Sequence, residues 1–591
     1  MERNRNYFTA VALSVAIVFI WQFLYVNPRI EAMREQKKIS HSIDSSTQRD
    51  TSNQGNTSSF ISPILVDQAQ ALTLSPRIKI ESPSLVGSIN MRGAQFDDIS
   101  LKGYHINISE NSPKVTIFSP SNTANAYFAT LDYGSKSTTS DMDFPKENTV
   151  WTLVSGKNLT PSTPIKLAFK NTHNVSFERV ISMDNNYLFT ITDVIANNSK
   201  TPITFSPHGR ITRYKTKTET NSFGVQEGFI AVLGDTSLIE KKYSDIEKSS
   251  VSNFHESNGW LGIADKYWAS AFVPPRDKEF QSQFKYSLDE QPRYQADFKT
   301  NETILMPRQS RKITNLLFVG AKEVPIINYY EKQFNIPRFE MLIDWGWFYF
   351  IAKPMFMLMS YFYNLIGNFG LAILLTTVCV KILFFPLAKK QYISTANMKK
   401  IQPQIDELKE KFKQSPPQVL QKSILQLYKT HNINPLAGCW PILLQIPVFF
   451  AIYKVISISL EMRHAPFFGW IQDLSAPDPT NIFNLFGLLP FDTPSFMHIG
   501  IWPLIMSLSM FLQMKMSPPP ADKGQAIVMN WMPVIFVFAL SSFPAGLVIY
   551  WSWSNIISII QQAVIMKMHG AKIDLVERLC AVFTKYFFSK R

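Results

Sequence analysis

Cysteine is scarce in this sequence of 591 residues, which contains only Cys379, Cys439 and Cys580. None of them belongs to a C-x-x-C motif, and none has a histidine at the spacing of metal ligands. Neither a disulfide framework nor a zinc site is therefore supported. We expect no metal ion and no organic cofactor.

Long apolar runs are missing from residues 28–340, so we expect this segment to lie outside a membrane. Elsewhere such runs are frequent. Residues 7–26 are an uncharged run of 20 residues, which as a helix matches the ~30 Å hydrocarbon core of a bilayer. The later uncharged runs cover residues 355–380, 435–453, 496–514 and 526–566.

The last of these runs has 41 residues, about twice the ~20 that one span needs. Pro and Gly within residues 541–547 offer a turn that would split it. The sequence thus predicts six transmembrane helices. A cleaved signal peptide is the alternative for residues 7–26, but no A-x-A site follows and aromatic residues mark both ends, which favours an uncleaved anchor.

Positive charge predominates, with 59 Lys and Arg against 45 Asp and Glu. Residues 389–434 contain nine lysines and three acids, the tail after Met566 contains six basic residues and two acids, and residues 461–495 contain one Arg and four acids. The positive-inside rule places both termini and the lysine-rich segment in the cytoplasm. Because this rule explains the excess, we expect no sequence-specific nucleic-acid partner.

Alternation of apolar and polar residues dominates the segment after residue 60. It predicts short strands, including one at residues 104–108 and a hairpin that turns at residues 184–186. Repeated strands without long helical patterns indicate one large antiparallel sandwich. No catalytic constellation stands out in it, so we expect a protein that is not an enzyme.

Two helical stripes follow in the lysine-rich segment, on either side of Pro416 and Pro417. Apolar residues step by three and four in both, which predicts two antiparallel helices that bury these stripes against each other. The stripes are Met398, Ile401, Ile405, Leu408 and Phe412, then Leu420, Ile424, Leu427 and His431. The pattern fits a docking arm and a solvated hairpin without a partner about equally.

These patterns predict a mixed architecture, in which a polytopic α-helical membrane protein carries a large β domain. Aromatic residues before the break at Lys353 and Pro354 favour a helix that lies in the outer interface. The predicted parts are an anchor (1–27), a Ser-, Thr-, Asn- and Gln-rich linker (28–60), a β-sandwich domain (61–338), a membrane core (339–566) with an interfacial helix (339–352) and a cytoplasmic helical hairpin (389–434), and a basic tail (567–591).

Lys381 lies inside an apolar run, where a charge costs roughly 2.5–3.5 kcal/mol on insertion scales. Snorkelling of its side chain to the interface is the simplest explanation. However, no acid occurs in any of the apolar runs, and the predicted topology places a set of amides in the cytoplasmic half of the spans or near its middle. That set is Gln445, Gln513, Asn530, Asn555, Gln561 and Gln562. An unpaired lysine beside them favours a wet groove open to the cytoplasm.

Large apolar side chains accompany this set. Met506, Met510 and Met514 recur every four residues, and Phe449, Tyr550 and Trp551 belong to neighbouring spans. Packing or lipid contact is the better interpretation of each residue alone. Together they suggest an apolar slide beside the groove.

The sequence resembles the YidC/Oxa/Alb family of membrane protein insertases, of the Gram-negative type with a large outer domain. The matching stretches are "NPLAGCWPILLQIPVFFAIY" (434–453), "DLSAPDP" (473–479), "MSPPPAD" (516–522) and "MPVIFVFALSSFPAGLVIYWSWSNIISIIQQ" (532–562). A further match, "GWLGIADKYWASAFVPP" (259–275), lies in the β domain. The resemblance implies a five-helix insertase core and a periplasmic β-supersandwich in a bacterial inner membrane.

The resemblance also implies a mechanism: hydrophilic parts of a nascent membrane protein enter a positively charged groove while its apolar segment slides into the bilayer, with or without the Sec translocon. Lys381 matches the groove's basic position, where Gram-negative relatives usually carry Arg. The implied substrate-contact positions are Thr377, Phe449, Met510, Tyr550 and Trp551. The hairpin lysines Lys409, Lys411 and Lys413 are candidates for docking the ribosome or nascent chain.

Two other classes of protein fit the sequence less well. A secondary transporter would show internal repeats and coupling carboxylates at mid-membrane, and neither is evident. A membrane-anchored periplasmic enzyme would show acid/base pairs in the outer domain and nothing unusual in the spans. The sequence shows the reverse, which favours the insertase.

Overall fold

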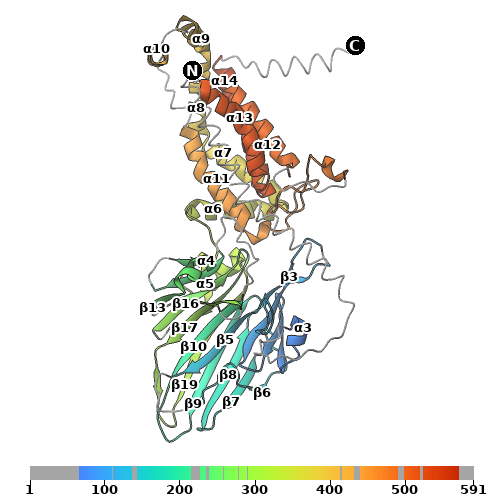
Figure 1. Ribbon diagram of the computed structural model, residues 1–591, viewed down its shortest axis with the longest axis vertical. Coiled ribbons are helices and arrows are strands. Elements are labelled where there is room, and N and C mark those ends of the chain that lie inside the picture. The colour runs from blue at the N-terminus through green and yellow to red at the C-terminus, as the bar shows by residue number, and fades with distance from the viewer. Residues whose placement is uncertain are drawn as a thin grey trace, which may run out of the picture. The chain divides into compact units, whose positions relative to one another are not determined.

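The computed structural model describes residues 66–109, 111–135, 143–214, 227–234, 238–256, 258–276, 278–288, 291–412, 416–431, 440–489, 498–518 and 523–570 (Figure 1). The chain divides into two units, a β unit and a helical unit, between Asp344 and Trp345. The anchor predicted at residues 1–27, the linker at 28–60, Lys413 and residues 571–591 of the predicted tail lie outside the described residues.

The β unit is an antiparallel sandwich, in agreement with the alternation of its sequence (Figure 1). One sheet has ten strands: β1 (Arg77–Glu81), β2 (Leu85–Asn90), β3 (Gln95–His105), β4 (Lys114–Phe118), β5 (Tyr127–Gly134), β10 (Ile203–Tyr214), β13 (Val251–Glu256), β16 (Phe280–Leu288), β17 (Pro292–Thr300) and β18 (Thr303–Leu305).

The other sheet has nine strands: β6 (Thr152–Ser155), β7 (Ile165–Lys170), β8 (Val175–Met183), β9 (Leu188–Asn197), β11 (Gly228–Leu233), β12 (Ile239–Lys242), β14 (Gly259–Ala264), β15 (Trp268–Val273) and β19 (Ser310–Ala321). Helices α3 (Gln68–Ala71), α4 (Tyr243–Ser249) and α5 (Val324–Gln333) complete the unit. Aromatic side chains from both sheets form its core, as where Phe229 stacks on Phe284 at 4.8 Å.

The hairpin predicted to turn at residues 184–186 is confirmed, because β8 and β9 pair with Met183 opposite Phe189. The strand predicted at residues 104–108 is wrong in its second half. β3 ends at His105, and Ile106 and Ile108 are more than half exposed. Alternation persists in the sequence beyond the point where a neighbouring strand is present to cover it.

A buried ion pair lies between the sheets of this sandwich. Arg179 of β8 is fully buried and donates two hydrogen bonds, of 2.8 and 2.9 Å, to the carboxylate of Asp193 on β9. It donates a third, of 2.9 Å, to the carbonyl of Leu131 on β5 in the other sheet. The hydroxyl of Tyr133 donates to the same carboxylate. The guanidinium group of Arg179 is thus the counterion of a buried carboxylate and also links the two sheets.

Replacing Arg179 by alanine is expected to lower the free energy of unfolding of this unit by about 3–5 kcal/mol, because the buried Asp193 carboxylate would lose its counterion. Denaturant titration of the full chain in detergent, followed by the protease resistance of the β unit, measures the change. Lys166→Ala is the matched control, since Lys166 pairs with Glu178 at the surface of the neighbouring strands and should cost at most ~1 kcal/mol. Equal losses of unfolding free energy in the two variants would contradict the conclusion that the Arg179–Asp193 pair stabilises the core.

The helical unit begins at Trp345 (Figure 1). Its helices are α6 (Tyr349–Ile366), α7 (Phe369–Leu383), α8 (Phe385–Lys400), α9 (Gln402–Lys411), α10 (Pro417–Thr430), α11 (Trp440–Ile458), α12 (Ile501–Met516), α13 (Lys523–Leu540) and α14 (Ala545–Met568), with short 3-10 turns η4 (Leu460–Met462) and η5 (Leu485–Gly487). The turn predicted at residues 541–547 is confirmed, because α13 ends at Leu540 and Pro544 precedes α14.

The run at residues 355–380, predicted as one span, is broken in the structure. Helix α6 ends at Ile366, and Gly367, which follows it, has a left-handed φ of 76°. The Asn368 side chain caps α7 by accepting from Leu371 N at 3.0 Å. Glycine tolerates this conformation and asparagine is a preferred N-cap, so two local signals outweigh the apolar run.

The interfacial helix predicted at residues 339–352 is wrong in outline. Its first part is the 3-10 turn η2 (Phe339–Leu342), and Phe339 is buried against Trp260 and Phe318 in the core of the β unit. Its last part belongs to α6, which starts at Tyr349 and continues through Pro354. The conformation of residues 339–352 therefore depends on contacts with residues that are distant in the sequence.

No individual helix in the described part of the chain has both the length and the hydropathy expected of a membrane span, although α7 and α8 meet the criterion together, with a bend of 69° between them. The count of six spans remains a prediction. The helices nevertheless expose many large apolar side chains, among them Met357, Tyr361, Leu365, Ile382, Leu383, Phe450, Leu504, Leu508, Phe511, Trp531, Val534, Ile560, Val564 and Met568.

The two stripes of the lysine-rich segment pack as the sequence predicts. Ile401, Ile405 and Ile424 form a buried cluster, and Met398, Leu420, Leu427 and Tyr428 pack against it. The His431 ring adds a hydrogen bond of 3.1 Å to Gln404. Leu408 and Phe412 were also expected in this contact but do not belong to the cluster.

Candidate functional site

A buried polar stripe runs along α14. Ser554, Ser558 and Gln562 are four residues apart and therefore lie on one face of the helix, with Asn555 beside them. All four are buried, because α14 packs against α7, α8, α11 and α12. Polar side chains inside an apolar helical unit require partners from those neighbouring helices.

Lys381 of α7 meets this stripe. Its ammonium group donates a hydrogen bond of 2.8 Å to the hydroxyl of Ser558, which in turn donates to the carbonyl of Ser554 at 2.9 Å. The ring hydroxyl of Tyr392, on α8, interacts with Ser558 as well. The lysine is half-buried, and within the described part of the chain no acid lies within ion-pair distance of it.

Helix α12 supplies the next contacts of the stripe. Asn555 donates a hydrogen bond of 3.0 Å to the hydroxyl of Ser509, which is itself buried. Gln562 donates to the hydroxyl of Ser517 at 3.4 Å, just beyond the end of α12. We refer to Lys381, Ser509, Ser554, Asn555, Ser558 and Gln562 as the polar band.

A separate polar contact joins α11 to α14. Gln445 donates a hydrogen bond of 2.6 Å to the hydroxyl of Tyr550, which is 2% exposed. Two residues of the predicted groove are not drawn into such contacts with α14. Asn530 is exposed and accepts a hydrogen bond of 3.4 Å from Lys515, and Gln513 is half-buried, with no hydrogen-bond partner among the described residues.

Sequence patterns identified Lys381, Asn555 and Gln562 but not Ser509, Ser554 and Ser558. A serine in a helix attracts little notice, because its hydroxyl can bond to the carbonyl one turn earlier. The fourfold spacing of Ser554, Ser558 and Gln562 is the signal that could have identified the stripe.

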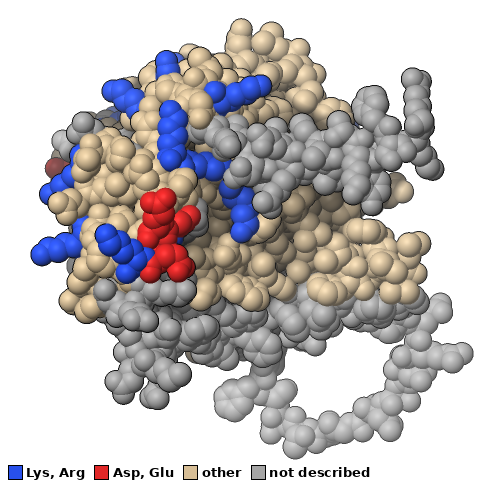
Figure 2. Space-filling view, turned by 90° about the horizontal axis from the view of Figure 1, so that it is seen from above, with Lys and Arg blue, Asp and Glu red and all other residues tan. Residues whose placement is uncertain are grey.

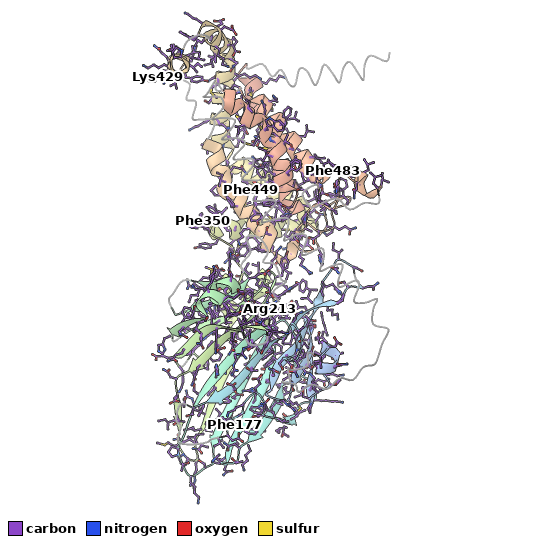
Figure 3. The ribbon with its side chains drawn as sticks, viewed as in Figure 1. Phe177, Arg213, Phe350, Lys429, Phe449 and Phe483 are labelled. Carbon is purple, nitrogen blue, oxygen red and sulfur yellow. The ribbon has the colours of Figure 1, made fainter. Side chains whose placement is uncertain are left out.

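The residues of the predicted apolar slide are divided by burial. Thr377 and Tyr550 are fully buried, and the Thr377 hydroxyl donates to its own helix at Ile373. Phe449, Met510 and Trp551 are half-buried, and the rings of Phe449 and Trp551 are 4.8 Å apart. Figure 3 shows Phe449 among the helices of the unit.

The hairpin of α9 and α10 carries the lysines expected to dock a partner. Lys409 forms an exposed ion pair of 3.3 Å with Asp406, and Lys411 lies 6.0 Å from the ring centre of its neighbour Phe412. Figure 2 shows many basic side chains on the corresponding face, whereas the acidic ones gather mainly in one patch. The surface is therefore mainly basic, although some of its lysines, such as Lys409, form ion pairs with neighbouring acids.

Two family models together match nearly all of the described chain. The model described as YidC periplasmic domain matches residues 77–358, and the model described as 60Kd inner membrane protein matches residues 361–572. They correspond to a β-sandwich followed by a helical core, the architecture described above, and define a class of inner-membrane proteins with a periplasmic domain.

Full-length relatives identify the family. The chain is 52% identical to a membrane protein insertase YidC of Rhizobium etli and 47% identical to one of Brucella melitensis, covering 99% of both chains in each case. The protein thus belongs to the YidC family of membrane protein insertases, as the sequence motifs predicted. A crystal structure of an active YidC insertase matches 84% of this chain and 95% of its own, with 16% identity and a TM-score of 0.34.

A cysteine in place of Lys381 is expected to react with a water-soluble maleimide in inverted membrane vesicles, because the sequence predicts a groove that is open to the cytoplasm and would admit water. The background would have its three native cysteines replaced by serine. Thr377→Cys, one turn away on the same face of α7 and 1% exposed, is the matched control and should stay unlabelled. Equal labelling of both positions, or of neither, would contradict a polar band hydrated at Lys381.

Proposed function

We propose that this protein inserts membrane proteins into the bacterial inner membrane and helps them fold, alone or with the Sec translocon, without catalysing a chemical reaction. Its clients are nascent membrane proteins, and the ribosome and the lipid bilayer are its other partners. The observation that carries the proposal is Lys381, a cation in an apolar helix that has a hydroxyl partner but no acid among the described residues.

The polar band would receive the hydrophilic parts of a client. A lysine held by a hydroxyl keeps its charge uncompensated, and its attraction for an acidic group is far stronger beside apolar helices than in water. Ser509, Asn555 and Ser558 are buried, so their hydrogen bonds would pass to a polar chain when the helices around them separate. Gln445, Gln513 and Asn530 would extend this path, as the sequence predicts.

The apolar part of the client would move along Phe449, Met510 and Trp551, which remain half-exposed beside the polar band. Thr377 and Tyr550 are buried, so contact with a client requires the helices around them to separate. The hydrophilic part of a client would thus follow the polar band, while its apolar part would move along the neighbouring apolar residues into the bilayer.

The proposed orientation follows from charge. Both termini and the hairpin (389–434) would lie in the cytoplasm and the β domain (61–338) in the periplasm. The anchor (1–27) and the core (339–566) would provide six spans. Lys409, Lys411 and Lys413 would then face the ribosome or the emerging chain at the membrane surface.

Substitutions of Lys381 should show whether insertion depends on the positive charge at this position or on the particular shape of the lysine side chain. Lys381→Arg should support insertion, whereas Lys381→Ala should slow clients with acidic translocated tails at least fivefold, because the attraction between two unit charges is ~1 kcal/mol even in water and is larger beside apolar helices. Lys381→Glu should be worse, and clients with short neutral tails should be affected less. The measurement is the rate of insertion into proteoliposomes at equal protein levels.

Lys567→Ala provides the control for Lys381, because Lys567 lies in the last turn of α14 and is exposed. It should insert both client types at the normal rate. A snorkelling Lys381 with no role predicts instead that Lys381→Ala is neutral or mildly stabilising, because a costly charge is removed. Normal insertion of acidic clients by Lys381→Ala would therefore reject the proposed role.

Replacing Lys409, Lys411 and Lys413 together by glutamate should slow co-translational insertion severalfold, because the hairpin would repel an anionic ribosome surface. Crosslinking of ribosome–nascent-chain complexes and protease protection of the client measure the effect. The control replaces Lys400, Lys422 and Lys429 by glutamate, which changes the net charge equally on other parts of the segment. Equal effects would indicate a dependence on net charge without a local docking site.

A further inference from the structure

A compact turn at residues 482–489, between η4 and α12, exposes an unusual number of apolar side chains. Leu488 is 81% exposed and Phe486 is 56% exposed. The full set is Phe483, Leu485, Phe486, Leu488 and Leu489. No charged residue occurs from residue 479 to residue 491. Water is a poor solvent for such a surface, so a covering environment is required.

The backbone of this turn is suited to an environment without water. Several of its amides donate to acceptors in or next to the turn: Phe486 N to Asn481 O at 2.9 Å, Leu488 N to Leu485 O at 3.3 Å, and Leu489 N to Asn484 O at 3.1 Å. The Phe483 amide donates to the buried side chain of Asn481 at 3.1 Å. Backbone groups that are paired internally can enter hydrocarbon, whereas unpaired ones cannot.

The conformation of the turn is also strained. Leu485 and Phe486 have φ angles of 49° and 61°, in the left-handed region that bulky residues rarely adopt. The amide of Ile482 donates to Ile499 O at 3.0 Å, which fixes the turn to the segment that enters α12. These contacts keep the large apolar side chains of the turn exposed. Without them the turn could fold back onto the protein and bury these side chains.

We propose that the 482–489 turn is a lipid anchor, whose apolar side chains enter the membrane at its interface. Lipid is the occupant because the turn is bonded through Ile482 to Ile499, just before α12, and α12 itself exposes Leu504, Leu508 and Phe511. Figure 3 shows Phe483 standing out from the side of the helices, on the opposite side from Phe350. A laterally projecting apolar turn without charge meets acyl chains and headgroups first.

The leaflet depends on the orientation proposed above, but the contact with lipid does not. In that orientation the turn lies in the outer leaflet, beside the outer end of α12. It would fix the rotation of α12 in the bilayer, as interfacial aromatic and apolar residues do for spanning helices. The 482–489 turn would therefore act on α12, the helix that carries Ser509 and Met510, without contacting a client.

The test uses the full chain without native cysteines, reconstituted into phosphatidylethanolamine and phosphatidylglycerol vesicles. An environment-sensitive fluorophore is attached to Leu488→Cys, to Phe483→Cys as a second site, or to Gln472→Cys, an exposed polar position in the same inter-helix segment, as the matched control. Quenching by lipids with a nitroxide at carbon 5 or 12 is compared with quenching by aqueous iodide.

We expect emission from positions 483 and 488 to shift to the blue, with lipid nitroxide quenching at least threefold stronger than at position 472 and iodide quenching correspondingly weaker. Carbon-5 nitroxides should quench more than carbon-12 nitroxides. Iodide quenching at 483 and 488 equal to that at 472 would overturn the proposal. So would protection from both quenchers combined with disulfide crosslinking between copies through Leu488→Cys, which would identify a second copy as the occupant.

Discussion

Polar groups that are buried inside an apolar helical unit must form hydrogen bonds with one another, and in this protein most of these bonds involve α14. Its buried serines, asparagine and glutamine bond mainly to groups of α14 itself and of the neighbouring helices. Lys381 from α7, Ser509 from α12 and Gln445 from α11 each bond to a different residue of α14. The relative positions of four helices are therefore coupled to one helix face. A helix rotated out of this register would leave polar atoms unpaired, so the polar band also specifies the packing.

The segment that carries the motif "DLSAPDP" holds two of these helices at their first turns. Asp478 is buried and accepts hydrogen bonds from the amide of Trp502 at 2.9 Å and from the indole of Trp470 at 3.1 Å. A carboxylate that accepts from an amide in the first turn of α12 also complements the helix dipole. The carbonyls of Leu474 and Ala476 accept from Gly546 and Ala545 at the start of α14. One loop thus sets the separation of α12 and α14 at which Asn555 reaches Ser509.

Local periodicity was sufficient to predict the parts of this protein that are built from repeated local patterns. The sandwich and the packing of Ile401, Ile405 and Ile424 follow from periods of two and of three to four. It failed where distant residues decide, as for Phe339, whose partner Trp260 lies 79 positions earlier. The place of Asn530 in the groove stays a prediction, since its side chain is exposed and accepts a hydrogen bond from Lys515. Ser558 escaped notice because its importance lies only in facing Lys381.

The presence of lysine, where the family resemblance leads one to expect arginine, suits the geometry of the polar band. A guanidinium fork is matched to two parallel acceptors, whereas Ser558 offers one hydroxyl. An ammonium group has three donors, of which Ser558 accepts one, and no other acceptor for them is found in the described part of the chain. The two remaining donors can bond to water and exchange it for a carboxylate or carbonyl of a passing chain. In the proposed function, a single weakly held cation would combine attraction with easy release, which transient contact with many different clients requires.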